Sequence, residues 1–299
     1  MSRHIVYIIN PVSGTIPKKK LQELIEKKTA GKKIPFQLFP SVASGDYSFL
    51  HALIKEQNVT DIVIAGGDGT VSQVVNSLMD CTVNFGIIPC GSGNGLAYTA
   101  KIPKQPAKAL DVIFRGKSSA IDGFYINERF ACMLCGVGFD AKVAHDFARQ
   151  PKRGLATYIK QAVKNFFAAK TYSFKLTVKN KTFITDAYFI SIANSNQFGN
   201  NFTIAPEAKL NDGLLDIVVV TNQSKLSVVL QTLKQIRGKN KLQTDLIEKK
   251  KERVIYFQTD KITINNLCLA PLHIDGEPVE TSDLLKISVK KKCFRLIQP

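Results

Sequence analysis

Two glycine-rich loops have the residue types and the spacing of a phosphate-binding site. Residues 66–70 read GGDGT at the end of the apolar run DIVIAGG, and residues 90–97 read CGSGNGLA after a second apolar run. Each loop is predicted to lead from a strand into a helix, where backbone N–H groups and the positive end of the helix dipole attract anions. Glycine lets the backbone approach a phosphate without obstruction by a side chain. The loops therefore predict an anion site, though not a Walker A site, because neither loop contains Gly-Lys-Ser or Gly-Lys-Thr.

Asp68 is the residue of these loops whose charge needs an explanation. A carboxylate alone would repel phosphate, so we expect Asp68 to hold a divalent cation or to position a hydroxyl group beside the phosphates. The alternative is a tight glycine turn with an ordinary Asx interaction. Asn10, Ser13 and Gly14 form a third polar turn after the first apolar run. Three such turns after successive parallel strands would converge at one edge of a sheet.

The elements that must position these loops alternate between strand and helix over the first 120 residues. Unbroken apolar runs predict strands buried on both faces, as in a parallel sheet covered by helices. This order predicts a doubly wound, Rossmann-like α/β domain, which binds ligands at the carboxyl ends of its strands. The expected strands are 4–10, 34–39, 61–67 and 84–89, and the expected helices are 18–29, 46–57 with Asp46 as its N-cap, 69–79, and further turns up to about Phe114.

The pattern changes after about residue 120, and the rest of the chain is mostly strand-like. Several runs alternate apolar and polar residues, which is typical of half-buried antiparallel strands. We therefore expect an α/β domain over 1–120 and a mainly antiparallel β-sandwich domain over 121–299, whose last strand packs back on the first domain. Within the second domain we expect helical insertions near 153–168 and 224–237 and a hairpin tip at Asn180-Lys181.

The charge of the chain is unusual. Forty-one Lys and Arg residues oppose 24 Asp and Glu residues, so the formal net charge is +17. Such a chain is attracted to nucleotides, nucleic acids or acidic lipid headgroups, and charge alone does not choose among them or exclude a role in solubility. Lys-rich stretches lie near 18–33, 239–251 and 290–292. The first residues are expected to form a strand rather than a secretory signal, and no run of 18 apolar residues occurs, so membrane contact is expected to be peripheral.

Six cysteines bear on the compartment and on metal chemistry. Most lie in apolar segments and not at disulfide-like spacings in loops, which suits a reducing cytoplasm. Cys132 and Cys135 form a lone CxxC motif. With no second pair, zinc or redox chemistry is disfavoured, and we expect both to be small core residues of a strand.

Several motifs together resemble the diacylglycerol kinase catalytic-domain family, which includes bacterial soluble lipid kinases and the sphingosine and ceramide kinases. The resemblance covers essentially the whole chain, and the order and spacing of the motifs make it specific. It implies an ATP-dependent lipid kinase whose second domain takes the lipid. The motifs are NPVSG at 10–14, SVASGD at 41–46, GGDGTVSQVVN at 66–76, PCGSGNGLA at 89–97, GVGFDA at 136–141, APEAKLNDGLLD at 205–216 and HIDGEP at 273–278.

The resemblance also implies roles for individual residues. Asp68 would organise the phosphates and a catalytic Mg²⁺. The side chain of Asp212 and the carbonyl groups of Lys209 and Leu214 would bind a structural Mg²⁺. Glu277 would be the general base, supported by Asp275. Asp140 would lie near the lipid headgroup. The residues implied to contact ATP are Asn10, Ser41, Gly66, Gly67, Asp68, Gly69, Thr70, Val71, Ser72 and Ser92.

The residues by themselves leave plainer interpretations open. Asn211-Asp212-Gly213 is also typical of a hairpin turn. The segment 275–277 is also an acidic turn between strands, and Asp140 is a candidate N-cap for the helix that follows it. His273 is the histidine nearest a proposed site, and we expect a packed or surface side chain without a catalytic role.

One departure from the family bears on the substrate. Bacterial diacylglycerol kinases of this family tend to carry an Asp after the Asn of the second loop, where this chain has Gly95. The GSGNGLA form looks more like sphingosine kinases. The resemblance thus implies transfer of the γ-phosphate of ATP to a lipid hydroxyl, with diacylglycerol or a sphingoid base as acceptor at an anionic membrane surface.

Three other functions compete with this hypothesis. A NAD kinase also uses GGDGT and would phosphorylate a dinucleotide. A non-catalytic nucleotide or lipid sensor would bind ATP without turnover, and the missing carboxylate at Gly95 is its best support. A nucleic-acid binder is supported by charge alone, and no RNA- or DNA-binding motif occurs, so no nucleic-acid partner is expected. A second copy of the chain is a further candidate partner.

Overall fold

The computed structural model describes residues 3–14, 16–150, 161–162, 164–166, 168–197, 203–243 and 252–299. The chain divides into two compact units, one formed by Met1–Ile121 with Lys292–Pro299 and the other by Asp122–Lys291. The boundary expected near residue 120 lies beside this division. The chain crosses between the units within two strands, β5 (Ser118–Ile126) and β15 (Leu284–Ile297).

The first unit contains a parallel sheet. Its strands lie in the order β2-β1-β3-β4, every neighbouring pair is parallel, and the last residues of β15 pair in parallel with β4. β3 is buried along its whole length because it is central and covered on both faces. The strands are β1 (Ile5–Ile9), β2 (Phe36–Pro40), β3 (Asp61–Gly66) and β4 (Asn84–Pro89).

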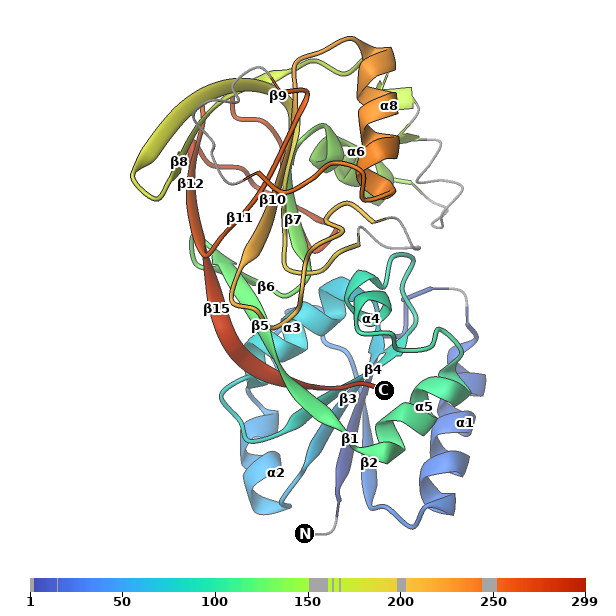
Figure 1. The fold of residues 1–299 in the computed structure, drawn as a ribbon. Helices are drawn as coiled ribbons and strands as arrows, with labels where there is room; N and C mark the ends of the chain where they lie inside the picture. The colour runs from blue at the N-terminus through green and yellow to red at the C-terminus, as the bar shows by residue number, and fades with distance from the viewer. Residues whose placement is uncertain are drawn as a thin grey trace. The chain divides into compact units, whose positions relative to one another are not determined.

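Helices cover both faces of this sheet. Figure 1 shows α1 and α5 on one side and α2 and α3 on the other. Lys28 Nζ lies 2.7 Å from Asp111 Oδ1, which joins α1 to α5, and the His51 ring lies 3.0 Å from the Ser77 carbonyl oxygen, which joins α2 to α3. The predicted doubly wound fold is confirmed. The helices are α1 (Lys18–Gly31), α2 (Leu50–Glu56), α3 (Asp68–Leu78), α4 (Gly95–Thr99) and α5 (Pro106–Arg115).

The predicted start of α2 was wrong. The helix begins at Leu50 and Asp46 does not cap it. The Asp46 carboxylate instead accepts the backbone N–H of Ser48 at 2.9 Å, and the backbone N–H of Tyr47 donates to the Ser77 hydroxyl at 3.2 Å. This local Asx turn competes with the helix for the same backbone groups.

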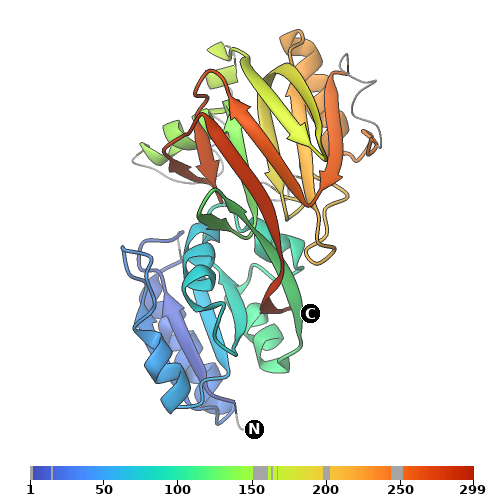
Figure 2. The same ribbon diagram turned by 90° about the vertical axis from the view of Figure 1, so that its left-hand side faces the viewer.

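The second unit is an antiparallel β-sandwich, as predicted (Figure 2). One run of paired strands is β14-β13-β7-β9-β10-β11, and another is β8-β12-β15-β5-β6. β9 belongs to both, because its first half pairs with β8 and its second half pairs with β7 and β10. The remaining strands are β6 (Arg129–Ala131), β7 (Leu134–Gly138), β8 (Tyr172–Val178), β9 (Lys181–Ala193), β10 (Leu215–Thr221), β11 (Val254–Thr259), β12 (Lys261–Asn266), β13 (Leu272–Ile274) and β14 (Glu277–Val279).

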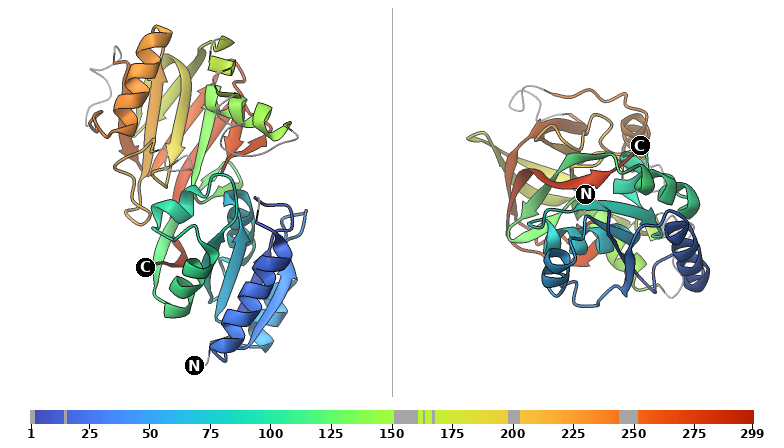
Figure 3. Two further views of the ribbon diagram at one scale, coloured as in Figure 1. Left: turned by 90° about the vertical axis from the view of Figure 1, so that its right-hand side faces the viewer. Right: turned by 90° about the horizontal axis from the view of Figure 1, so that it is seen from below.

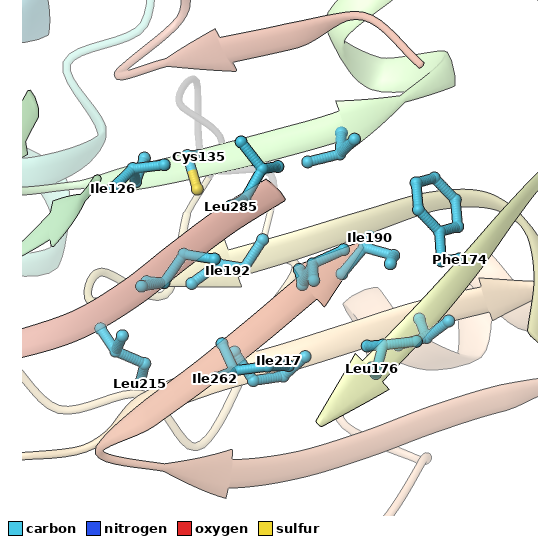
Figure 4. Packing of buried hydrophobic residues seen from close by; sticks show 14 of the residues in the cluster. Ile126, Cys135, Phe174, Leu176, Ile190, Ile192, Leu215, Ile217, Ile262 and Leu285 are labelled. Atoms are coloured by element: carbon cyan, nitrogen blue, oxygen red, sulfur yellow. The ribbon is translucent and has the colours of Figure 1, made fainter. Parts of the chain in front are cut away.

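The core of the second unit lies between these two layers. In Figure 4, Ile190, Ile192 and Ile217 from one layer pack against Phe174 and Leu176 from the other. β8 and β12 alternate between buried and more exposed residues, whereas β10 is buried throughout. The alternation is typical of a sheet with one face toward solvent.

The other sequence predictions for this unit had mixed outcomes. α8 (Lys225–Ile236) confirms the helix expected near 224–237, and α6 (Phe139–Ala148) is the helix expected after Asp140. Residues 153–160 of the helix expected near 153–168 lie outside the described residues, and the described residues from 161 to 168 are helical. The hairpin tip is at Lys179-Asn180, one residue earlier than expected, because both residues have positive φ.

The cysteines are free thiols, as expected for residues without disulfide spacing. Cys132 and Cys135 are both buried, and burial raises the pKa of Cys135 well above its usual value, with the carboxylates of Asp275 and Asp140 adding to the effect. Such a thiol is a poor metal ligand or nucleophile. The CxxC residues are core residues, as predicted.

Candidate active site

Three loops meet at the carboxyl edge of the parallel sheet in the first unit. Gly14 lies after β1, Gly67 after β3 and Gly91 after β4. A Cβ atom on Gly91 would lie 2.5 Å from the Cα atom of Gly67, and one on Gly14 would overlap the carbonyl oxygen of Cys90. The loops therefore pack backbone against backbone, which only glycine allows at these places. The predicted convergence of the three loops is confirmed.

The N-terminus of α3 provides the backbone donors of this edge. Gly67 is the N-cap in an extended conformation, and the helix begins at Asp68. The N–H groups of a first helical turn have no partner within the helix and attract anions. Thr70 is tied to the first loop, because Asn10 Nδ2 donates to Thr70 Oγ1 at 2.8 Å. The hydroxyl of Ser72 is buried and has no partner within the part of the chain that is described.

The other residues expected to contact ATP lie at the same edge. The backbone N–H of Ser41, just after β2, donates to the Ile9 carbonyl oxygen at 2.9 Å. Ser92 lies in the loop after β4 and is half-buried, and Val71 is buried in α3. The structure thus brings the predicted ATP residues, Asn10, Ser41, 66–72 and Ser92, to the carboxyl ends of four neighbouring strands.

Asp68 has a partner that the sequence did not suggest. Its Oδ2 atom accepts the backbone N–H of Gly95 at 3.0 Å, and its Oδ1 atom accepts that of Leu96 at 3.2 Å. These N–H groups belong to the first turn of α4, so the carboxylate caps that helix and joins the two glycine loops. Gly95 contributes its backbone N–H to this contact, and any residue other than proline would supply the same group.

Asn94 fixes the shape of the second loop. It has φ +57° and ψ +41°, a left-handed conformation that asparagine tolerates better than most residues. Its side chain accepts the N–H of Gly91 at 2.8 Å and donates to the carbonyl oxygen of Gly91 at 2.7 Å. Asn94 is buried, so these two bonds satisfy its amide and hold the loop rigid.

The residues at this edge fit the phosphates of a nucleotide. At the contact of Gly67 with Gly91 no side chain stands between backbone and ligand, and the end of α3 supplies N–H donors. Lys18 Nζ donates to the carbonyl oxygen and the hydroxyl of Ser13, so a cation lies beside the first loop. The residues also fit a divalent cation, because the Asp68 carboxylate at this edge offers the oxygen ligands that such cations take.

The second unit carries the acidic turn expected to supply the base. Asp275 and Gly276 have φ of +48° and +83° and form a two-residue turn between β13 and β14, in which Ile274 pairs with Glu277. Glu277 is exposed, and no hydrogen bond or ion pair holds its carboxylate within the residues that the structure describes. The turn thus places an exposed carboxylate at the start of β14.

Asp275 is buried and is anchored to the backbone. Its Oδ1 atom accepts the N–H groups of Met133 and Leu134 at 3.0 and 2.9 Å, and its Oδ2 atom accepts that of Cys132 at 3.1 Å. Asn194 binds the same segment between β6 and β7, because its Nδ2 atom donates to the Cys132 carbonyl oxygen at 3.0 Å. Asp275 therefore positions the turn, while its predicted catalytic role stays a prediction.

Asp140 lies beside His273, next to the same turn. The two side chains are buried, and His273 Nε2 lies 3.4 Å from Asp140 Oδ2. The N–H of Gly276 donates to His273 Nδ1 at 3.3 Å, so the neutral ring carries its proton on Nε2, facing Asp140. A Cβ atom on Gly136 would overlap Asp140 Oδ2. Asp140 is not an N-cap, because Gly138 holds that position of α6.

The residues predicted to hold a structural Mg²⁺ lie in the loop before β10. Asp212 is exposed and its Oδ1 atom accepts the N–H of Leu214 at 3.0 Å. Asn211–Gly213 is a turn but not a hairpin, because the preceding strand, β9, ends far upstream. One carboxylate with the carbonyl groups of Lys209 and Leu214 is an oxygen set of the kind that Mg²⁺ takes together with water.

Asp216, the second residue of β10, lies beside this loop. Burial raises the pKa of Asp216 to about 6, hydrogen bonds from Tyr256 and Gln258 offset part of that effect, and the nearby charges of Asp212 and Glu207 add to it. Tyr256 donates to Asp216 Oδ1 at 2.5 Å and its hydroxyl oxygen accepts the backbone N–H of Glu207 at 2.9 Å. Three acidic residues thus lie close together at this loop.

Four residues of these sites were missed or given no role by the sequence. Asp122, Asn194 and His273 hold loops through partners that are distant in the sequence; for example, Asp122 is buried and accepts the Gly213 N–H at 2.7 Å. Spacing therefore carries no signal for these three residues. Asn94 instead binds Gly91, three positions away, and asparagine beside glycine is typical of a left-handed turn position.

Comparison with known families agrees with this geometry. Residues 4–126 match the diacylglycerol kinase catalytic domain, and residues 134–297 match the YegS C-terminal NAD kinase β-sandwich-like domain. Together the two matches span both units of the chain. Within the described residues no helix has the length and apolarity needed to cross a bilayer.

Relatives with assigned names cover most of the chain. It is 24% identical over 277 residues to a diacylglycerol kinase of Bacillus subtilis (strain 168), which covers 90% of this chain and 88% of the relative. It is 27% identical over 251 residues to a probable lipid kinase YegS-like protein of Shewanella frigidimarina (strain NCIMB 400), covering 81% and 77%.

Solved structures share the fold. A crystal structure of a diacylglycerol kinase from Bacillus anthracis str. Sterne superposes with a TM-score of 0.74 at 19% identity, covering 99% of this chain and 97% of that one. A second crystal structure from the same organism gives a TM-score of 0.79 at 19% identity, with the same coverage. The chain therefore belongs to the lipid kinase family that joins a diacylglycerol kinase catalytic domain to a YegS C-terminal domain.

Proposed function

We propose that the protein transfers the γ-phosphate of ATP to the hydroxyl group of a membrane lipid. The observation that carries this proposal is the backbone contact between the Gly67 and Gly91 loops beside the N-terminus of α3. A cradle built from backbone N–H groups suits phosphate and little else. Membership of a lipid kinase family supplies the acceptor class.

The first unit binds the nucleotide in this proposal. The N–H groups at 68–70 bind the phosphate oxygens beside the 91–95 loop, and the Asn10–Thr70 pair keeps the first loop in place. Mg²⁺, when bound with ATP, neutralises charge that develops on the phosphates. Asp68 holds the two loops together and is the carboxylate at this edge that would reach the cation.

The second unit supplies the base. Glu277 accepts the proton of the lipid hydroxyl as its oxygen forms a bond to the γ-phosphorus, and the bond from that phosphorus to the oxygen of ADP breaks. Asp275 and the His273–Asp140 pair hold the turn that carries Glu277. Asp140 would also lie near the lipid headgroup.

Diacylglycerol or a sphingoid base is the acceptor we propose. The name of the Bacillus subtilis relative supports the first, and Gly95 in the second loop supports the second. We further propose that a structural Mg²⁺ binds at Asp212 with the carbonyl groups of Lys209 and Leu214. The enzyme is proposed to be cytoplasmic and to attach peripherally to anionic membranes.

The test is a kinase assay on a panel of lipids. Protein with labelled ATP and Mg²⁺ is given diacylglycerol, monoacylglycerol, sphingosine, ceramide and phosphatidylglycerol in mixed micelles. Glu277→Gln removes the base, and Glu280→Gln is the matched control because Glu280 is another exposed carboxylate just after β14. We expect one labelled lipid, lost with Glu277→Gln and kept with Glu280→Gln; equal activity of both variants would exclude Glu277 as the base.

A NAD kinase is the second candidate. It is favoured by the match of residues 134–297 to a NAD kinase-like β-sandwich. Adding NAD to the panel separates the two, because label on NAD with none on lipid would reject the lipid acceptor. ATP binding with no labelled product would favour a sensor.

A further inference from the structure

Helix α8 turns polar side chains toward its own domain. Among its residues from Lys225 to Gln235, whose burial the structure describes, Ser227, Val228 and Gln235 are buried, and two of these three are polar. The Ser227 hydroxyl donates to Gln223 Oε1 at 2.6 Å, and Gln235 Nε2 donates to the Ile204 carbonyl oxygen at 2.8 Å. A helix on the surface of a globular protein normally buries its apolar side. In α8 this order is inverted.

The opposite side of α8 is an apolar stripe that faces solvent. Leu226 is 72% exposed, Val229 42%, Leu230 51% and Leu233 42%. The spacing of these four residues (i, i+3, i+4, i+7) places them on one face of the helix. Figure 3 shows α8 lying along the outside of the strands of the second unit. A continuous apolar face of this kind indicates a binding surface.

Basic residues surround the apolar stripe. Residues 222–243 contain five Lys and Arg residues and no Asp or Glu. Lys234 is exposed on the flank of the stripe, and Arg237, Lys239 and Lys241 are exposed just beyond its C-terminal end. Lys225 borders the first turn, with its ammonium group 5.9 Å from the centre of the Phe166 ring. Leucine between lysines on one helix is the composition of a helix that lies in a membrane interface.

We propose that the apolar stripe of α8 and its basic border form the surface by which the enzyme docks on an anionic phospholipid bilayer. Leu226, Val229, Leu230 and Leu233 enter the boundary between headgroups and acyl chains, and the Lys and Arg side chains bind lipid phosphates. The inference rests on the proposed function in one respect, since a lipid acceptor lies in such a surface.

Charge favours a bilayer over a second copy of the chain. Two copies that paired symmetrically through this stripe would place the same basic border opposite itself, and like charges at an interface oppose association. An anionic bilayer complements both parts of the surface, because its headgroups attract the cations and its acyl chains receive the leucines.

The test measures binding to vesicles without ATP. Co-sedimentation is run with vesicles of phosphatidylcholine alone and with vesicles that contain phosphatidylglycerol. Leu226→Gln/Leu230→Gln removes the two most exposed residues of the stripe and keeps helix-forming residues. Ile184→Gln is the matched control, because Ile184 is 62% exposed on β9, outside α8. Lys234→Gln/Arg237→Gln/Lys239→Gln removes charge and leaves the stripe intact.

The proposed surface predicts how strongly each variant binds vesicles. The wild type and Ile184→Gln bind phosphatidylglycerol vesicles, while the double leucine variant binds about tenfold more weakly or worse. The triple basic variant loses the preference for anionic vesicles and most of the salt dependence. Circular dichroism checks that each variant is folded. Vesicle binding by the double leucine variant equal to that of the wild type would overturn the proposal.

Two further measurements distinguish membrane docking from dimer formation and from catalysis. If sedimentation without lipid shows a dimer that Leu226→Gln/Leu230→Gln converts to a monomer, the stripe is a contact between copies and the proposal is wrong. Kinase activity on a dispersed short-chain lipid is expected to be the same in this variant and the wild type. A wild type that binds vesicles through α8 and phosphorylates no lipid would refute the proposed function and leave the docking surface standing.

Discussion

At the scale of single residues, the site depends on backbone groups that particular side chains hold in place. Asp68 binds two N–H groups of α4, Asn94 closes the second loop, and Asp275 binds three N–H groups around Met133. Each carboxylate or amide satisfies donors that a loop would otherwise leave without partners in the interior. Acidic residues near a phosphate site can therefore serve its shape as well as its chemistry.

Gly91 tests the requirement for close backbone contact. In Gly91→Ala the new Cβ atom would lie 2.5 Å from Cα of Gly67 and 3.0 Å from Asn94 Oδ1, so the loops must separate. We expect affinity for ATP to fall about tenfold or more, measured by isothermal titration calorimetry. Gly31→Ala is the control, because a Cβ atom there meets nothing within 4 Å. Unchanged ATP affinity in Gly91→Ala would show that phosphates do not bind at this contact.

Asp275 and Glu277 are expected to differ in what they contribute. Asp275→Asn replaces an acceptor oxygen by a donor amide against three buried N–H groups, so we expect the free energy of unfolding to fall by about 2–3 kcal/mol. Glu277→Gln alters an exposed side chain and should leave the urea midpoint unchanged while abolishing lipid phosphorylation. Chemical denaturation of both variants checks this. Equal stability of Asp275→Asn and the wild type would show that the anchor is not needed for folding.

At the scale of elements, two short strands carry the proposed base. β13 and β14 are three residues long each, and they are positioned by α6 through Asp140 and by β7 through the pairing of His273 with Gly136. Gly136 lacks a side chain where the Asp140 carboxylate lies. The hairpin has little strength of its own, so its place depends on these neighbours.

His273 tests this dependence. His273→Ala removes the acceptor of the Gly276 N–H and the partner of Asp140, so the turn before Glu277 loses its support. We expect kcat to fall about 10- to 100-fold, because small displacements of a catalytic group are costly. The dissociation constant of ATP should not change, since the glycine loops belong to the other unit. A rise of that constant with kcat intact would contradict a positioning role.

The pairing of β10 with β11 is expected to make stability depend on pH. Burial raises the pKa of Asp216 from 3.8 to about 6. Its protonated form is thus favoured by the fold, so its contribution is fully present below about pH 4 and is lost as pH rises through about 6. Two pKa units correspond to about 3 kcal/mol. Urea midpoints between pH 4 and 7 in EDTA should show this fall in the wild type and not in Asp216→Asn; parallel curves would refute it.

The elements also show what the sequence could predict. Periodicity identified the parallel strands and the three loops at their ends, because apolar runs and glycines are local signals. Cys132 and Cys135 were expected to lie in one strand, but the strand is broken at Cys132 and Met133, between β6 and β7. The cause is the carboxylate of Asp275, more than 140 residues away. Asp68 likewise has partners, the N–H groups of Gly95 and Leu96, that only the fold brings near.

At the scale of the whole molecule, the chain crosses between its two units twice. It passes from the first to the second within β5 and returns within β15, whose last residues pair with β4. Phe294 packs against Phe85 at the end of this path, with ring centres 5.9 Å apart. The C-terminal residues are therefore part of the core of the first unit, although they follow the whole β-sandwich in sequence. The first unit is therefore built from two separate parts of the sequence.

The net charge of +17 leads to a prediction for the intact enzyme. If the charge serves attraction to anionic bilayers, added salt should weaken activity on lipid in vesicles, because the screening length falls from about 10 Å at 0.1 M to about 3 Å at 1 M. Activity on a dispersed short-chain lipid should fall much less over the same range. Initial rates in NaCl from 0.05 to 0.5 M, about one decade, would span this change. Equal salt dependence on both substrates would place the effect of charge at the nucleotide site rather than at the membrane.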